Sequence, residues 1–194
     1  MQSRNRGLTS VRNSRIVYTT CMLNSGRKGD RIARVRQSHA ASVLLARLAE
    51  REGPPRVFTK SHSRSAIAVA MGNDFGLSLG IDIEWIAPER PVASIARSFL
   101  GDASADITVA DFYRFWTFHE SYFKAFQRTP ETALALELIG QGARDGVRRL
   151  HDGTKILQHR VAETFQLSLV WSGAGDDCVP HHLGDFVEGA GEYG

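Results

Sequence analysis

Two acidic residues, Asp82 and Glu84, alternate with apolar residues in the segment Leu79-Gly80-Ile81-Asp82-Ile83-Glu84. A period of two is typical of a β-strand, and it places both carboxylates on one face, roughly 7 Å apart along the backbone. Two carboxylates on one face repel each other unless a cation lies between them. The pair alone does not decide between a cation site and the polar outer face of a half-exposed strand.

A third acid, Glu120, stands four residues before Lys124 in a segment rich in aromatic residues. Residues four apart are neighbours on a helix surface, so this pair could be an ordinary surface ion pair. At about 100° per residue, however, Tyr113, Thr117, Glu120 and Lys124 form a polar strip beside an aromatic arc. A carboxylate at the margin of a buried face can point into a cleft between the helix and a sheet.

The aromatic arc itself is predicted to face the core and consists of Phe112, Phe115, Trp116, Phe123 and Phe126. His119 falls within this arc, and we interpret it as a packing histidine.

Hydroxyl and imidazole groups gather in Ser61-His62-Ser63, directly after Lys60. Such groups in a loop are suitable donors to a phosphate. Capping serines in a loop are the commoner explanation of this short motif.

The pattern of apolar residues and chain breakers predicts an α+β protein with mainly antiparallel sheet. Residues 72–74 are expected to join two strands as a hairpin. The first helix is expected in two pieces that meet near residues 37–39. Predicted strands cover residues 15–23, 65–71, 75–86, 133–139, 155–162 and 164–171, and predicted helices cover 31–49, 92–100 and 108–127.

Positive charge is concentrated early in the chain. Residues 1–60 hold 13 Lys and Arg against 3 Asp and Glu, whereas the remainder holds 11 against 18. A basic first part favours a polyanionic partner, such as nucleic acid, a phosphorylated cofactor or an acidic protein. A solvated, arginine-rich surface would give the same pattern.

Three motifs occur in a fixed order: S-H-S, then G-I-D-I-E, then W-T-x-x-E-S-Y-x-K-A. They resemble the 4′-phosphopantetheinyl transferases, specifically the surfactin-type branch, in which both halves of the protein lie in one chain. The resemblance covers about residues 16–171, and its longest motif runs from Trp116 to Ala125.

The resemblance implies two similar α/β halves with antiparallel sheets, related by a pseudo-twofold axis, with coenzyme A in the cleft between them. The chain would then consist of a disordered basic lead-in (1–14), an N-terminal half (15–87), a C-terminal half (88–173) and a flexible acidic tail (174–194).

The resemblance also implies roles for individual residues. Asp82, Glu84 and Glu120 would match the family's magnesium ligands, with Mn²⁺ as a possible substitute, because Mg²⁺ prefers hard oxygen ligands. Lys124 would match the lysine that contacts the phosphates of the coenzyme.

For the nucleotide side, Ser61 and His62 would match the loop that holds the 3′-phosphate. The family's nucleotide-binding arginine aligns near residues 41–42, and its charge could come from Arg34, Arg36 or Lys60. A further departure is His119, which stands where the family usually has a lysine.

The implied reaction moves 4′-phosphopantetheine from coenzyme A to a serine of an acyl or peptidyl carrier protein and releases 3′,5′-ADP. Glu120, or a water activated by the metal, would take the serine proton, and Lys124 would stabilise the leaving group. The segment 88–111 is the expected carrier-docking region.

A cytoplasmic monomer without membrane or nucleic-acid partners is expected. Both halves of the site lie in one chain, no apolar run approaches the roughly 20 residues that cross a bilayer, and the N-terminal segment lacks the apolar region of a secretory signal. Two alternatives stay open: a non-catalytic relative that binds coenzyme A or a carrier protein, and a basic nucleic-acid-binding protein.

Overall fold

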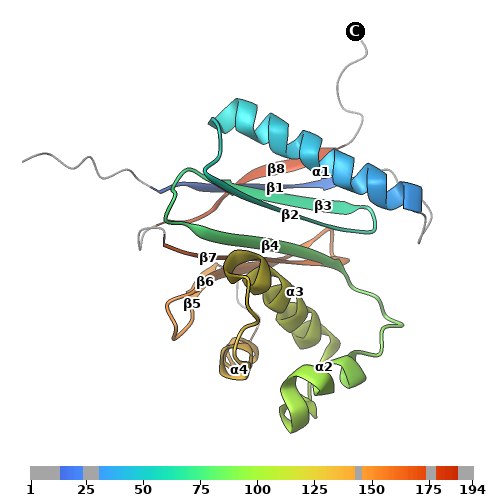
Figure 1. Ribbon diagram of the computed structural model, residues 1–194. Helices are drawn as coiled ribbons and strands as arrows, with labels where there is room; N and C mark the ends of the chain where they lie inside the picture. The colour runs from blue at the N-terminus through green and yellow to red at the C-terminus, as the bar shows by residue number, and fades with distance from the viewer. Residues whose placement is uncertain (1–13, 24–30, 143–145, 174–177, 188–194) are drawn as a thin grey trace, which may run out of the picture.

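The computed structural model describes residues 14–23, 31–142, 146–173 and 178–187 (Figure 1). It is a mixed α/β fold in which two four-stranded sheets, with strand orders β2-β3-β1-β8 and β4-β7-β6-β5, pack against each other. The elements are β1 (Ile16–Met22), α1 (Arg31–Glu52), β2 (Val57–Ser63), β3 (Ala66–Gly72), β4 (Ser78–Trp85), α2 (Val92–Leu100), the short 3-10 helix η1 (Gly101–Ser104), α3 (Val109–Phe126), α4 (Thr132–Gly140), β5 (Val147–Arg149), β6 (Lys155–Val161), β7 (Phe165–Ser172) and β8 (His181–Val187).

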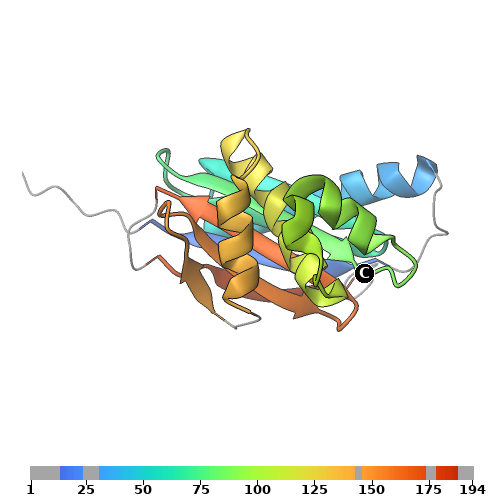
Figure 2. The ribbon, with the colours of Figure 1, turned by 90° about the horizontal axis from the view of Figure 1, so that it is seen from below.

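Helices cover both outer faces of the paired sheets. Helix α1 lies on the first sheet, α3 and α4 lie on the second, and α2 packs against α3 (Figure 2). The central core lies between the sheets and is built from Ile16, Tyr18, Ala66, Ala68, Ala70, Leu77, Leu79, Ile81, Ile83, Phe165, Leu167, Leu169 and Trp171. The expected α+β class is compatible with this arrangement, since all strand pairs of the described sheets are antiparallel except that of β1 with β8.

The predicted period of two in β4 is confirmed. Leu79, Ile81 and Ile83 are buried between the sheets, so the intervening residues face α3. A Cβ on Gly80 would lie 1.9 Å from the backbone oxygen of Ser121 in α3. Glycine is therefore required where helix and strand touch, and this close contact sets the position of α3 over β4.

The predicted hairpin of residues 65–86 is wrong, because β3 and β4 belong to different sheets. Strand β3 is buried along its whole length and lies between β1 and β2. Its hairpin partner is β2, and Arg64 in the turn has a φ of 51°. The Ser61-His62-Ser63 motif accordingly lies in a strand and not in a loop.

Three further expectations need correction. Residues 133–139 form helix α4 and not a strand, with Leu134, Ala135 and Leu138 buried at helical spacing. Helix α1 is a single helix. Within the expected tail 174–194, residues 181–187 form β8, which pairs with β1, whereas 174–177 and 188–194 lie outside the described residues, as do 1–13 of the lead-in.

The predicted aromatic arc of α3 is largely confirmed: Phe112 and Phe115 are buried, but Phe123 is 45% exposed. Tyr113 and Thr117 of the polar strip are fully buried because they face the second sheet, where the Thr117 hydroxyl lies 2.6 Å from that of Ser168.

None of the helices in the described ranges is both long and apolar enough to cross a membrane.

Tyr18 gives a prediction for alkaline pH. Burial, assisted by the charge of Asp185, raises the pKa of its phenol from 10.0 to about 12. Above pH 10 the unfolded chain loses this proton while the folded protein keeps it, so the free energy of unfolding should fall by about 1.4 kcal/mol per pH unit up to about pH 12. Urea unfolding of wild type and Tyr18→Phe at pH 8–11.5 should give curves that diverge above pH 10; parallel curves would contradict the assignment.

Candidate functional site

Hydroxyl side chains of β2 lie along the free edge of β4. The Thr59 hydroxyl accepts a hydrogen bond from the Ile81 N–H at 3.3 Å, and the Ser63 hydroxyl accepts one from the Trp85 N–H at 3.1 Å. These two edge strands of different sheets are thus joined through side chains. One face of β2 is held against the part of β4 that carries the acidic pair.

The Asp82 carboxylate is 4% exposed and is held mainly through one oxygen. Its Oδ1 accepts hydrogen bonds from the Ser61 hydroxyl at 2.7 Å and from the Lys124 ammonium at 2.8 Å. Lys124 also donates to the Ile81 carbonyl at 3.0 Å. Among the described residues, the buried Asp82 Oδ2 has no hydrogen-bond partner. A buried carboxylate oxygen without a donor is costly, so this atom marks a place where a cation would be stabilising.

Glu84 lies beside Asp82 on the same face. Its Oε2 accepts a hydrogen bond from the Ser63 hydroxyl at 3.1 Å and lies 3.5 Å from Arg90 Nη2. Burial, and then the charge of Asp82, raise the pKa of Glu84, although Arg90, Ser63 and Trp116 oppose this. The surroundings of Glu84 therefore disfavour its charged form.

Glu120 lies in α3, one turn after Trp116 and one turn before Lys124. Trp116 interacts with Glu84, and Lys124 interacts with Asp82. Its Oε1 lies 3.7 Å from His119 Nδ1. His119 holds the pKa of Glu120 below its ordinary value; burial opposes this, and the charge of Lys124 assists it. Glu120 is consequently ionised at neutral pH.

The interpretation of His119 as a packing residue is confirmed, because its ring contacts those of Phe99, Phe115 and Trp116.

Within the described ranges, no three His, Cys, Asp or Glu side chains converge closely enough to hold a metal ion. The structure thus brings Asp82 together with Ser61 and Lys124, and Glu84 together with Ser63 and Arg90. The joint metal site of Asp82, Glu84 and Glu120 stays a prediction.

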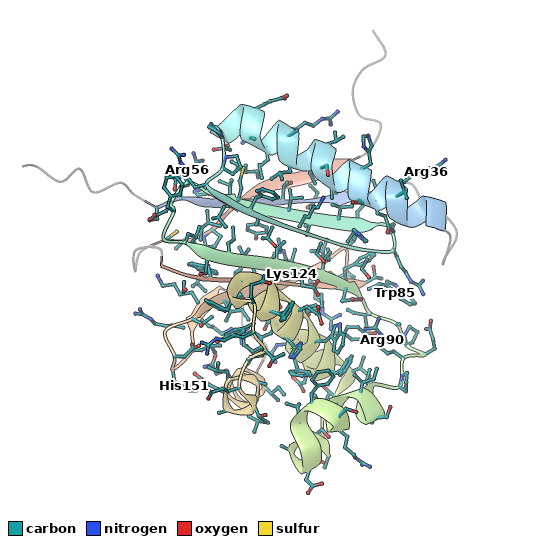
Figure 3. All side chains as sticks on the ribbon, viewed as in Figure 1. Arg36, Arg56, Trp85, Arg90, Lys124 and His151 are labelled. Carbon is teal, nitrogen blue, oxygen red and sulfur yellow. The ribbon has the colours of Figure 1, made fainter. Side chains whose placement is uncertain are left out.

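The other predicted binding residues lie elsewhere. Strand alternation places Lys60 and His62 on the exposed face of β2, opposite the buried Ser61, and Lys60 donates to the Ser42 hydroxyl of α1 at 3.1 Å. Figure 3 shows Arg36 on α1, on the outer side of the first sheet, and Lys124 beside β4. Arg34 lies in α1, but its side chain is outside the described part of the structure.

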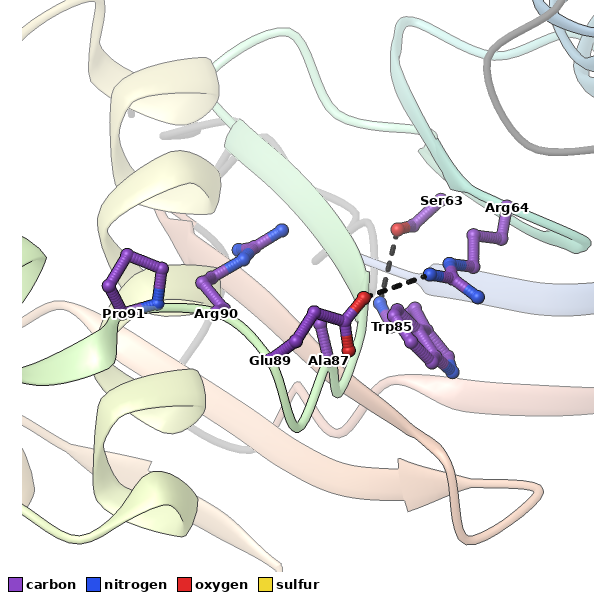
Figure 4. Close-up of a pocket in the computed structure, with 7 residues that line it drawn as sticks. All are labelled: Ser63, Arg64, Trp85, Ala87, Glu89, Arg90 and Pro91. Carbon is purple, nitrogen blue, oxygen red and sulfur yellow. Dashed lines mark hydrogen bonds and ion pairs between the residues drawn. The ribbon is translucent and has the colours of Figure 1, made fainter.

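A pocket of about 440 Å³ opens next to Glu84. Its lining includes Ser63, Trp85 and Arg90, and the Arg64 guanidinium lies over the Trp85 ring and 3.6 Å from the Glu89 carboxylate (Figure 4). The sequence reasoning missed these lining residues. The period of two in β2 could have paired Ser63 with Ser61, but residues in turns, such as Arg64 and Arg90, leave no periodic signal.

Comparison with known proteins adds no assignment: no family model matches this chain, and no curated protein matches it significantly.

Proposed function

We propose that the protein transfers 4′-phosphopantetheine from coenzyme A to a serine hydroxyl of an acyl or peptidyl carrier protein in a reaction that needs a divalent cation. The observation that supports this best is the buried Asp82 carboxylate: Ser61 and Lys124 hold one oxygen, and the other has no hydrogen-bond partner in the part of the chain that the structure describes. A free, buried carboxylate oxygen beside a second carboxylate is the chemistry that a hard cation requires.

The proposed donors are carboxylate oxygens, which Mg²⁺ prefers, with Mn²⁺ as the substitute. Asp82, Glu84 and Glu120 would be the ligands, and the cations that already interact with them are Lys124, Arg90 and, when protonated, His119. A bound Mg²⁺ would supply positive charge to the pyrophosphate of the coenzyme, on which charge develops as the phosphoryl bond breaks. Residues of the protein would stabilise the leaving group, accept the serine proton and bind the nucleotide.

Lys124 would stabilise the leaving 3′,5′-ADP. Its ammonium now contacts Asp82, but the side chain is 29% exposed, so it can turn toward an incoming phosphate. Glu120, ionised at neutral pH, would accept the proton of the carrier serine. The exposed Lys60, His62 and Arg36 would face the adenosine and 3′-phosphate. Arg34, whose side chain is not described, is the other residue proposed to supply charge to the nucleotide.

In this proposal, residues 15–87 and 88–173 are two similar halves related by a pseudo-twofold axis, with coenzyme A in a cleft between them. Two four-stranded sheets, each with helix on its outer face, support this view. Sheet membership crosses the boundary, however, since β4 pairs with β7 and β8 pairs with β1. The proposed enzyme works as a cytoplasmic monomer, and the carrier docks on residues 88–111.

The test is transfer itself. Purified protein is incubated with Mg²⁺, coenzyme A and a panel of apo carrier proteins, and the carriers are weighed by mass spectrometry. The proposal expects a pantetheine-sized mass gain that disappears with a metal chelator. Asp82→Asn protein purified in parallel excludes a contaminating transferase.

Failure to modify any carrier would reject the transferase. Measurable coenzyme A binding in that case would favour a non-catalytic relative. Salt-sensitive retention on DNA without coenzyme binding would favour the nucleic-acid alternative.

A further inference from the structure

The two serines of the S-H-S motif match the two acids of β4 in spacing. Ser61 and Ser63 are two residues apart on β2, and Asp82 and Glu84 are two residues apart on β4. Ser61 donates to Asp82 Oδ1 at 2.7 Å, and Ser63 donates to Glu84 Oε2 at 3.1 Å. Each carboxylate therefore has its own hydroxyl donor on the neighbouring strand, in matching register.

From this register we propose that Ser61 and Ser63 are positioning residues, which hold the Asp82 and Glu84 carboxylates for a divalent cation and do not bind a phosphate group themselves. The inference rests on the cation site of the proposed function. It changes the role of Ser61 from the one that the family resemblance implies.

The hydrogen-bonding capacity of the serines supports this role. A hydroxyl has one proton to donate, and Ser61 gives it to Asp82 while being only 8% exposed. Ser63 donates to Glu84 and also accepts from the Trp85 N–H, so its hydroxyl is fixed in both directions. A phosphate could be bound by either serine only after a carboxylate had lost its donor.

His62, between the two serines, has the opposite orientation. It lies on the exposed face of β2 together with Lys60. The motif is thus divided by strand alternation, with hydroxyls facing the carboxylates and the imidazole facing solvent. Of the three residues, His62 is the one that an external anion can reach.

Ser61 also determines which oxygen of Asp82 stays available. Both Ser61 and Lys124 bind Oδ1, and this arrangement leaves the buried Oδ2 without a hydrogen-bond partner among the described residues. Without the Ser61 hydroxyl the carboxylate could rotate, and Lys124 could then bind either oxygen. Hydrogen-bond partners that orient ligating carboxylates typically change metal affinity by 10–100-fold when they are removed.

Mn²⁺ binding, followed by electron paramagnetic resonance without coenzyme or carrier, tests the inference. Ser61→Ala and Ser63→Ala should each weaken Mn²⁺ binding by about tenfold or more. Ser61→Thr, which keeps the hydroxyl, should bind as wild type does. The matched control is Ser98→Ala, which removes an exposed hydroxyl on α2 whose hydrogen bond goes to the Ser94 carbonyl. Circular dichroism verifies that each variant is folded.

A second measurement distinguishes an effect of the variants on cation binding from an effect on phosphate binding. Binding of 3′,5′-ADP is measured by calorimetry in the presence of a chelator; Ser61→Ala should leave it unchanged, whereas His62→Ala should weaken it. The inference is overturned if Ser61→Ala binds Mn²⁺ like wild type, if it weakens 3′,5′-ADP binding under chelation, or if wild type binds Mn²⁺ no better than Asp82→Asn. If the serine variants lose Mn²⁺ while wild type modifies no carrier, the inference holds and only the transferase assignment fails.

Discussion

Replacement of Lys124 by methionine is expected to lower the free energy of unfolding by about 2–4 kcal/mol and to reduce the proposed pantetheine transfer by about 100-fold or more. The Asp82 side chain is only 6% exposed, and Lys124 is the cation that contacts it. Methionine keeps most of the packing of the lysine chain but leaves a buried carboxylate with Ser61 as its one remaining donor among the described residues. Urea unfolding at pH 7 measures the first effect, and carrier mass spectrometry measures the second.

The converse variant, Asp82→Asn, serves as the matched control. Its neutral amide can still accept the Ser61 hydrogen bond, and Lys124 can turn its ammonium to solvent. The stability loss should therefore be smaller, about 1 kcal/mol, while transfer is still lost. The double variant Asp82→Asn with Lys124→Met should be more stable than Lys124→Met alone. If Lys124→Met unfolds within about 0.5 kcal/mol of wild type, the ion pair is not structural and this reading of the site is wrong.

The second large effect is expected for Gly80→Ala, which should lower the free energy of unfolding by about 3 kcal/mol or more. The added Cβ would lie 1.9 Å from the Ser121 carbonyl oxygen and 2.8 Å from the Ala125 backbone nitrogen. Backbone atoms cannot move aside as a flexible side chain can, so α3 must shift away from β4. That shift would also separate Lys124 from Asp82, and transfer should fall together with stability.

Gly140→Ala is the control for this prediction. Gly140 ends α4, and a Cβ there meets nothing within 4 Å. Alanine should be neutral or slightly stabilising at this position. Thermal unfolding of the two variants gives the comparison, and equal melting temperatures would show that the contact of Gly80 with α3 does not limit stability.

Elements with a strong single period were predictable from the sequence. Strand β4 alternates cleanly, and α3 carries its aromatic residues at helical spacing, so both were placed with bounds close to those observed. Predictions failed where the local sequence pattern suggests one strand pairing and the folded chain has another. Strand β3 is apolar on both faces and followed by a turn-like segment, yet its partners are β1 and β2 and not the next strand.

Helix α4 and strand β8 were missed for related reasons. The α4 sequence is short and apolar, and such a run fits either a strand or a helix until its neighbours are known. Strand β8 contains Gly and Asp, which are poor strand formers, and its pairing with β1 decides its structure.

Asp82, Glu84 and Lys124 of the candidate site could be predicted from the sequence, but the residues that contact them, such as Ser63 and Arg90, could not. An acidic pair and an i, i+4 spacing can be recognised in the sequence, and they predict Asp82, Glu84, Glu120 and Lys124; of these, the structure brings Lys124 into contact with Asp82. The hydroxyls that join β2 to β4 depend on two sheets meeting at their edges. No sequence pattern within β2 or β4 specifies this contact between the edges of the two sheets.

The pairing of β8 with β1 has a consequence for synthesis of the chain. Strand β1 ends at Met22, whereas β8 begins only at His181, so one edge of β1 leaves the ribosome long before its partner does. Until then that edge presents unpaired N–H and C=O groups, to which a strand of another nascent chain can add. Chains that stop before residue 181 would keep this edge open, and completion of the first sheet would be a late event on or after the ribosome.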